Sequence, residues 1–407
     1  MDHDALPKSA LSVPHYRRYF LASIFITFGL WTIRFLIGWE AWSLTESAFW
    51  VGVVSGIMLV PTFVLSPPFG VLADRMKLRL GLLITTSMLA IIGIAIALSW
   101  WLNWLSIEVL TCFALAKGLV MAAHHPLRFA MLPHLVPKPL LPSGVGTSSI
   151  LFNVSRIVAP ALAAALLMLS SSGVVFALSG FMFATGSIFL TRLPDGQGTG
   201  NRDTHLLNNL REGFFYAIKT PTIRLLLFVA ALNGFLGRAL VELLPAVSGQ
   251  LLNGTANTLA ILTALAGLGS VLAGVIIARQ RDKQQRFVNI ILGSLATTGL
   301  LMYALLLPTS LTLVAIVITL LALTMTLVSA GCQAMTQVSV SDDFRGRVMS
   351  FWAVIAMGVP AIGAFILGAM AELMGFPIAL SLLGTLVLIA VVAVKSKRHL
   401  WSNEKTS

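Results

Sequence analysis

Apolar stretches of about 20 residues, separated by short polar breaks, recur along the whole 407-residue chain. A helix of roughly 20 apolar residues crosses the hydrocarbon core of a bilayer. Because 57% of the residues are hydrophobic and only 10% are charged, most side chains are predicted to face lipid or the protein interior. The chain is therefore predicted to be an all-α membrane protein, with no room for a large soluble domain.

Twelve such stretches set the organisation of the chain. They are predicted near residues 19–41, 49–72, 80–101, 106–126, 142–165, 171–191, 223–248, 257–278, 286–307, 310–333, 347–371 and 376–394. A polar segment with an amphipathic stretch near 206–218 follows the sixth. We thus expect a six-helix bundle over 1–191, a cytoplasmic linker with a short amphipathic helix over 192–222, and a second bundle with a basic tail over 223–407.

The basic residues are confined to one set of segments. Outside the spans, every Lys and Arg falls in segments on the side of the N-terminus, and the alternate loops contain none. Cytoplasmic loops collect Lys and Arg, so both termini are predicted to lie in the cytoplasm. The membrane is predicted to be a bacterial inner membrane. The net charge of +12 is accounted for in this way, and no nucleic-acid partner is expected.

The two halves resemble each other. An offset of 204 residues places Arg34 on Arg238 and the run GVLADR at 70–75 on GVIIAR at 274–279. A similar offset places Pro160 on Pro360, each among small residues. Parallel repeats about an axis along the membrane normal are a known transporter architecture. The bundles are therefore predicted to be pseudo-symmetric.

A motif of charged residues follows the second span. Gly70, Asp74, Arg75 and Arg79 are spaced as Gly, three residues, Asp, Arg, three residues and a basic residue, with Lys77 between. The glycine allows two helices to approach, and the Asp with its basic neighbours can form charge-assisted contacts at the cytoplasmic face. We interpret the motif as a gating element. The alternative is an ordinary positive-inside loop.

The stretch 43–83 that contains this motif resembles the second and third helices of the major facilitator superfamily, although Lys77 stands where that family usually has a second glycine. The stretches 238–252 and 341–375 are similar to the branch with the enterobactin exporter and macrolide-type efflux proteins. This resemblance implies the twelve-helix major facilitator fold and efflux by alternating access. We also expect a monomer without enzymatic activity. The antiporter signature of helix five would fall at 159–164, where alanine replaces each glycine.

Ionisable residues inside spans are costly and usually face a cavity or a partner. Four basic residues lie deep within spans, against the single deep acid Glu242. Because carboxylates accept charge-assisted bonds from Arg, this excess of cations favours an anionic substrate. Stripes at helical spacing add polar and aromatic neighbours. The predicted substrate-binding residues are Trp31, Arg34, Lys117, His124, Asn153, Arg156, Arg238 and Gln333.

Other interpretations of these residues stay open. Arg34 and Arg238 have a structural alternative, neutralised by Glu40 and Glu242, and His124 has one as a solvated histidine at the span end. A drug-efflux pump would be compatible with the resemblance, although buried cations would then face a cationic ligand. A membrane enzyme would need a positioned base and nucleophile, for which we find no candidate, and a sensor would need an output domain.

The sequence therefore predicts a secondary transporter that exports a small anionic organic solute, most simply a carboxylate-type siderophore, by proton-coupled alternating access. Glu242 is the predicted proton-coupling residue. The alternative is a multidrug or macrolide-type efflux pump. No cofactor, metal or catalytic residue is expected, and Cys112 and Cys332 are interpreted as small buried hydrophobic residues.

Overall fold

The computed structural model describes residues 9–73, 76–196, 206–279, 284–307 and 310–396. The chain divides into two compact units, one formed by Met1–Glu40 and Val60–Asn201 and the other by Ala41–Leu59 and Arg202–Ser407. Within the described residues, eleven helices are long and apolar enough to span a membrane, and Ala48–Thr62, the first part of a longer helix, is a shorter apolar stretch. The bundle boundaries predicted at 191 and 223 stay a prediction.

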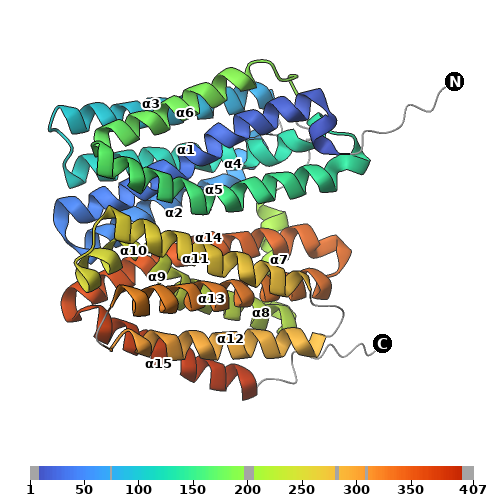
Figure 1. Cartoon of the computed structure of the whole chain (residues 1–407). Helices are drawn as coiled ribbons and strands as arrows, with labels where there is room; N and C mark the ends of the chain where they lie inside the picture. Colours follow the sequence, from blue (N-terminus) through green and yellow to red (C-terminus); the bar gives the residue numbers. More distant parts are fainter. Residues whose placement is uncertain (1–8, 74–75, 197–205, 280–283, 308–309, 397–407) are drawn as a thin grey trace. The chain divides into compact units, whose positions relative to one another are not determined.

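The helices of the first half correspond one for one to the predicted spans. They are α1 (Pro14–Thr45), α2 (Ala48–Ala73), α3 (Leu78–Trp101), α4 (Ile107–Leu135), α5 (Leu141–Leu169) and α6 (Ser172–Leu190). Short 3₁₀ turns precede α1 and α5, at Ala10–Ser12 and Lys138–Leu140. In the first unit α3 packs on both α4 and α6, and these helices lie side by side in Figure 1.

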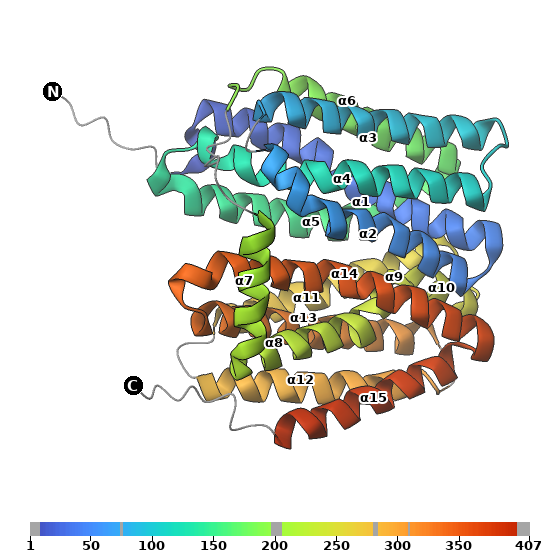
Figure 2. The same ribbon diagram turned by 180° about the vertical axis from the view of Figure 1, so that it is seen from behind.

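The second half begins with α7 (Leu206–Lys219), which occupies the stretch predicted to be amphipathic. The remaining long helices are α11 (Ala256–Ala278), α12 (Gln284–Ala304), α13 (Leu311–Ser339), α14 (Asp342–Met374) and α15 (Phe376–Ser396). Here α13 packs on α11 and α12, and α12 packs on α15. Figure 2 shows α7 lying across the ends of α8 and α14 instead of along them.

The seventh span departs from the single continuous run predicted over 223–248. It consists of α8 (Pro221–Leu232), a π-helical segment η3 (Asn233–Arg238), α9 (Ala239–Glu242), α10 (Leu244–Ala246) and a second π-helical segment η4 (Val247–Leu251). π-Helical turns inside α-helices are frequent at functional sites. The breaks place Arg238 and Glu242 on either side of a short α-helical turn.

The repeat predicted from the sequence has structural counterparts in the caps of two helices. Ser106 caps α4 and Ser310 caps α13, and each side-chain oxygen accepts the backbone N–H of the residue three positions on, at 3.4 and 3.2 Å. These serines are separated by the same offset as Arg34 and Arg238. The caps satisfy N–H groups that the first turn leaves unpaired.

Two glycine pairs give a second counterpart of the repeat. A Cβ placed on Gly93 in α3 would lie 2.9 Å from the Cα of Gly180 in α6. In the second unit, a Cβ on Gly384 in α15 would lie 2.9 Å from the carbonyl oxygen of Gly299 in α12. Glycine at these positions allows the backbones to approach closely. The two equivalent helix pairs are thus joined by equivalent contacts.

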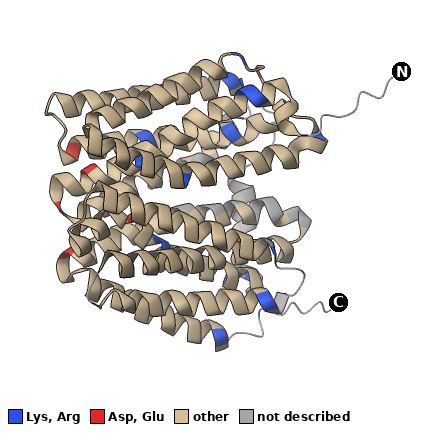
Figure 3. Cartoon of the chain, in the orientation of Figure 1, with Lys and Arg blue, Asp and Glu red and all other residues tan. Residues whose placement is uncertain are grey.

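The charged residues gather at particular positions along the helices. Figure 3 shows Lys and Arg of the second unit gathered toward the helix ends where the C-terminus lies, with Asp and Glu toward the opposite ends. In the first unit, basic residues gather at the end where the N-terminus lies, and a few stand midway along the spans. These midway cations define the candidate site.

Candidate functional site

Arg34 and Trp31 form a pair on α1 in the first unit. The guanidinium carbon of Arg34 lies 5.7 Å from the centre of the Trp31 ring, a cation–π distance. The Trp31 ring also meets Phe152 of α5 edge-on, with 5.4 Å between ring centres. Both side chains are half-buried. The aromatic contact joins α1 to α5 and fixes the side of α1 on which Arg34 stands.

The indole nitrogen of Trp31 is a buried donor. Trp31 Nε1 is inaccessible to solvent and has no hydrogen-bond acceptor among the residues that the structure describes. Buried polar groups in proteins are almost always paired, so an unpaired donor beside a cation marks a place where an acceptor would be stabilised. The chemistry of this pair suits a carboxylate or another anionic oxygen.

Lys117 and His124 lie on α4 and face the helix interfaces. Lys117 is 5% exposed, and next to it the carbonyl of Gly118 accepts from the hydroxyl of Thr62, at 3.4 Å. His124 is 2% exposed, and its Nδ1 is 3.0 Å from the hydroxyl of Thr85 on α3. His124 is therefore attached to α3, whereas the sequence alone allowed a solvated position at the span end.

Asn153 and Arg156 lie on α5. Asn153 is exposed, and its side-chain amide donates to the carbonyl of Ser149 one turn earlier, at 2.9 Å. Arg156 is half-buried. The two residues are three positions apart, so they share one side of the helix. Arg34, Lys117 and Arg156 thus come from three helices of the same unit.

The predicted residues of the second unit lie on the broken seventh span and on α13. Arg238 ends η3 and Glu242 ends α9, one turn apart, and both are half-buried. The backbone carbonyl of Glu242 accepts from the hydroxyl of Ser55, at 3.3 Å. Gln333 is half-buried on α13.

Two polar groups of this unit were missed by sequence reasoning. Asn233, which begins η3, is 2% exposed, and its amide donates to the carbonyl of Met325 on α13 at 3.1 Å. Its Oδ1 and the Nε1 of Trp352 on α14 are buried without a partner among the described residues. An Asn within the predicted span was the available signal, because amides in spans are costly unless paired.

Glu40 is a second buried acid, on α1. Its side chain is 5% exposed and hydrogen-bonded to Ser172 at the start of α6. The sequence interpretation assigned Glu40 only as a possible neutraliser of Arg34. The structure gives its carboxylate a partner on a different helix of the same unit.

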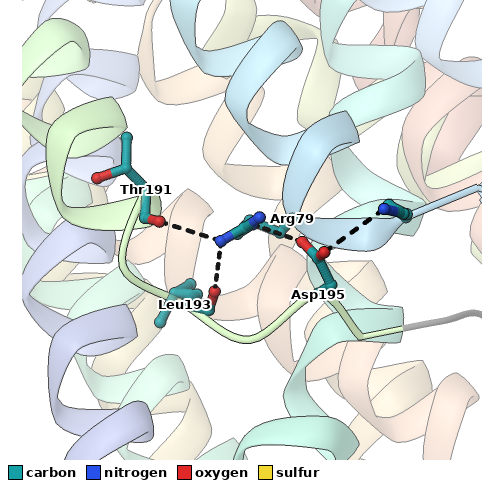
Figure 4. A network of polar contacts seen from close by, with 5 residues as sticks. Arg79, Thr191, Leu193 and Asp195 are labelled. Carbon is teal, nitrogen blue, oxygen red and sulfur yellow. Dashed lines mark hydrogen bonds and ion pairs between the residues drawn. The ribbon is translucent and has the colours of Figure 1, made fainter.

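The gating motif is described in part. Asp74 and Arg75 lie outside the described residues, and of Gly70 only its place near the end of α2 is described. Arg79, in the first turn of α3, donates to the carbonyls of Thr191 and Leu193 at 3.2 and 3.1 Å. Its Nε also pairs with Asp195 at 2.6 Å, as Figure 4 shows.

Asp195 was not predicted as a partner of this motif. Lys77 reaches its other carboxylate oxygen at 3.6 Å, and the backbone N–H of Leu78 donates to the carbonyl of Gly196 at 3.0 Å. Arg79 therefore holds the chain that leaves α6, inside the first unit. An acid directly after a span in an otherwise basic segment was a signal in the sequence, but only the tertiary fold identifies its partner.

Cys112 and Cys332 differ from each other. Cys332 is buried on α13, as expected, whereas Cys112 is exposed on α4. The expectation of a buried Cys112 is wrong because the apolar pattern of a span does not tell the outward face of a helix from its inward face.

A family model described as transmembrane secretion effector matches residues 6–406. Macrolide efflux protein A of Streptococcus pyogenes is 26% identical over 361 residues, which are 86% of this chain and 87% of that protein. The staphyloferrin A transporter of Staphylococcus aureus is 23% identical over 380 residues, 90% and 92% of the two chains. The solved nucleoside transporter NupG superposes with a TM-score of 0.76 at 11% identity, over 96% of this chain and 100% of NupG.

These similarities confirm several predictions from the sequence. The match to NupG shows the fold, and the relatives confirm the predicted resemblance to efflux proteins. The family consists of membrane transporters and not of enzymes, in agreement with the sequence interpretation. The chain belongs to the transmembrane secretion effector family, and it is a multi-pass transporter of the major facilitator superfamily.

Proposed function

We propose that this transporter exports a small anionic organic solute, of the carboxylate siderophore type, across the bacterial inner membrane. The observation that carries the proposal is the pair on α1: Arg34 stands over the Trp31 ring, and the buried indole N–H has no acceptor among the described residues. An anionic oxygen bound here would gain a charge-assisted bond from Arg34 and would satisfy the indole donor.

The distribution of charge supports an anion over a cation. Arg34 and Arg156 are half-buried and Lys117 is buried, all within the first unit. Glu40, the described acid buried among these spans, is already bonded to Ser172. A cationic drug in this environment would meet repulsion, whereas a carboxylate would meet several donors. We propose that further contacts to the solute come from Asn153 in the first unit and from Arg238 and Gln333 in the second. We propose that His124, on the same helix as Lys117, supports the position of the Lys117 side chain.

Proton coupling is proposed to involve Glu242. This acid ends α9, next to the π-helical segment that contains Arg238, so a local rearrangement of the span would change the surroundings of both side chains. Inward movement of protons would drive solute out as the bundles alternate between two conformations. The motif at Gly70, Asp74, Arg75 and Arg79 is proposed to gate the cytoplasmic side, and the transporter to act as a monomer with cytoplasmic termini.

The relatives support both the proposed substrate class and its alternative. One relative is described as a transporter of staphyloferrin A and another as a macrolide efflux protein. The second favours macrolide or multidrug efflux as the alternative function. The cluster of intramembrane cations is the reason that we place the anionic solute first.

Comparison of secreted metabolites tests the proposal. A deletion strain, the complemented strain and strains with Arg156→Ala or Arg156→Lys would be grown under iron limitation, with protein levels measured by immunoblot. We expect an anionic iron chelator to disappear from the medium of the deletion and Arg156→Ala strains and to return in part with Arg156→Lys. Unchanged secretion in the deletion strain, together with increased macrolide sensitivity, would overturn the proposal in favour of drug efflux.

A further inference from the structure

Helix α7 is fixed to the start of α14 within the second unit. The ring of Tyr216 stacks on Phe344 with 4.3 Å between ring centres and 1° between planes. Both the backbone N–H and the hydroxyl of Ser341 donate to the Tyr216 hydroxyl, at 3.4 and 3.3 Å. Ala217 is 3% exposed in an apolar cluster that includes Val340. These contacts hold one side of α7 against the bundle.

The connection to α8 determines the depth of α7 relative to the membrane. Thr220 alone separates Lys219, the last residue of α7, from Pro221, the first residue of α8. The segment Pro221–Glu242 is a candidate span. The end of α7 therefore lies where a span enters the bilayer. Since Figure 2 shows α7 crossing the ends of the spans, its axis follows the membrane surface.

The side of α7 away from the apolar cluster carries large apolar residues. Phe214 and Phe215 are each 47% exposed and Ile218 is 40% exposed. At 100° per residue these three fall on one arc of the helix, opposite Tyr216 and Ala217. Phe214 reaches Phe351 of α14 with its ring and still remains half-exposed. Among the long helices of the described chain, α7 has the strongest separation of apolar residues on one side from polar residues on the other.

Basic groups flank this apolar arc. Lys219 and Arg224 are both exposed. One guanidinium nitrogen of Arg224 donates to the carbonyl of Ile218 at 3.3 Å, which holds the charge beside the arc. Large apolar residues with Lys and Arg at the border are typical of helices that lie in a membrane surface, where the cations contact anionic headgroups.

We propose that α7 is a membrane-surface helix. Phe214, Phe215 and Ile218 enter the apolar edge of the adjacent leaflet, and Lys219 and Arg224 bind the phosphates of anionic phospholipids. The helix thereby anchors the segment between the two halves of the transporter to the leaflet. This role does not depend on which solute is transported.

Depth measurement by spin labelling tests the proposal on the full-length transporter. In a background with Cys112→Ser and Cys332→Ala, single cysteines replace Phe214, Phe215 or Ile218, and Glu212→Cys is the matched control on the exposed polar arc of the same helix. Nanodiscs contain phosphatidylethanolamine with phosphatidylglycerol, or phosphatidylcholine alone. Collisions with oxygen and with a water-soluble nickel chelate are then compared.

In the phosphatidylglycerol nanodiscs, we expect labels on the apolar arc to collide more with oxygen than with the chelate, and the Glu212→Cys label to show the reverse. We expect the apolar labels to lie shallower in phosphatidylcholine. With Lys219→Gln and Arg224→Gln, this difference between lipids should be lost.

Three results would overturn the proposal. The first is equal access of the chelate to the apolar labels and to the control. The second is protection of the apolar labels from both reagents, which would mean that protein covers this face. The third is a depth of the apolar labels that is the same with and without phosphatidylglycerol and is unchanged by Lys219→Gln and Arg224→Gln. This result would mean that the two cations do not contact anionic headgroups. Ile218→Cys is the smallest change and supports the test where a Phe variant does not fold.

Discussion

At the scale of single residues, the indole of Trp31 is the most direct probe of the substrate site. Its N–H has no acceptor among the described residues, so Trp31→Phe removes a donor that contributes no bond in the free protein. We expect thermal stability to stay the same or rise, and substrate affinity to fall by roughly tenfold or more, because a hydrogen bond to a charged acceptor contributes about 1.5–3 kcal/mol. Calorimetric unfolding and a binding titration measure the two effects. A loss of stability with unchanged affinity would contradict this assignment.

The ion pair between Arg79 and Asp195 is a second test at this scale. Both side chains are partly exposed, at 34% and 44%, so Asp195→Asn should cost less than about 1 kcal/mol of stability. We expect a larger effect on the segment after α6, which should become more accessible to protease because Arg79 holds this segment through Asp195. Trypsin should therefore cut faster after Arg192 in this variant. Lys77→Gln, whose amine is 3.6 Å from Asp195, is the control and should change cleavage little. Equal cleavage in the wild type and Asp195→Asn would contradict the role of the Arg79–Asp195 pair in holding the chain after α6.

The residues of the candidate site differ in how far the sequence could predict them. The positions of Arg34, Lys117, Arg156 and Arg238 within spans follow from hydropathy, because a charge inside an apolar run is visible in the sequence alone. The bond between His124 and Thr85 does not, since it depends on which face of α4 meets α3. Contacts of this kind join residues far apart in the chain, and no local pattern encodes them.

At the scale of helices, the approach of α11 to α13 is set by a glycine. A Cβ on Gly269 would lie 2.2 Å from the backbone carbonyl oxygen of Thr319, and a backbone atom cannot move aside as a flexible side chain does. Gly274, on the same helix, has open space around its Cβ position. We expect Gly269→Ala to destabilise the transporter by about 1–3 kcal/mol and Gly274→Ala to have little effect. Unfolding in mixed micelles compares them, and equal stability would contradict the close packing.

The elements show where prediction from the sequence stops. Twelve apolar runs predicted twelve helices, because length and hydropathy suffice to identify a span. The π-helical segments η3 and η4 were not predicted, since hydropathy does not report a change of hydrogen-bond register. Gly234, Gly237 and Pro245 within that span were the available signal, because such residues loosen a helix. The sequence also did not predict that α4 continues past Pro126 to Leu135, because the apolar run ends before the helix does.

At the scale of the whole molecule, the confinement of Lys and Arg to one set of segments predicts the orientation of the chain in the membrane. Trp104 precedes α4 and Lys138 follows it, so the two residues should lie on opposite sides of the membrane. In a background without Cys112 and Cys332, we expect a membrane-impermeant maleimide added to intact spheroplasts to label Trp104→Cys and not Lys138→Cys. Permeabilised cells, in which both should react, are the control. Labelling of Lys138→Cys alone would place the termini outside.

Transport into everted membrane vesicles tests the central claim, export of an organic anion, most directly. The cytoplasmic face is then outside, so an exporter should load the vesicles with a radiolabelled carboxylate siderophore when a proton gradient is present. We predict accumulation with the wild type, its loss on addition of a protonophore, and a reduction of roughly tenfold or more with Arg34→Ala, since a charged hydrogen bond contributes about 1.5–3 kcal/mol. No uptake above that of vesicles without the transporter, while a macrolide accumulates in the same vesicles, would contradict the account.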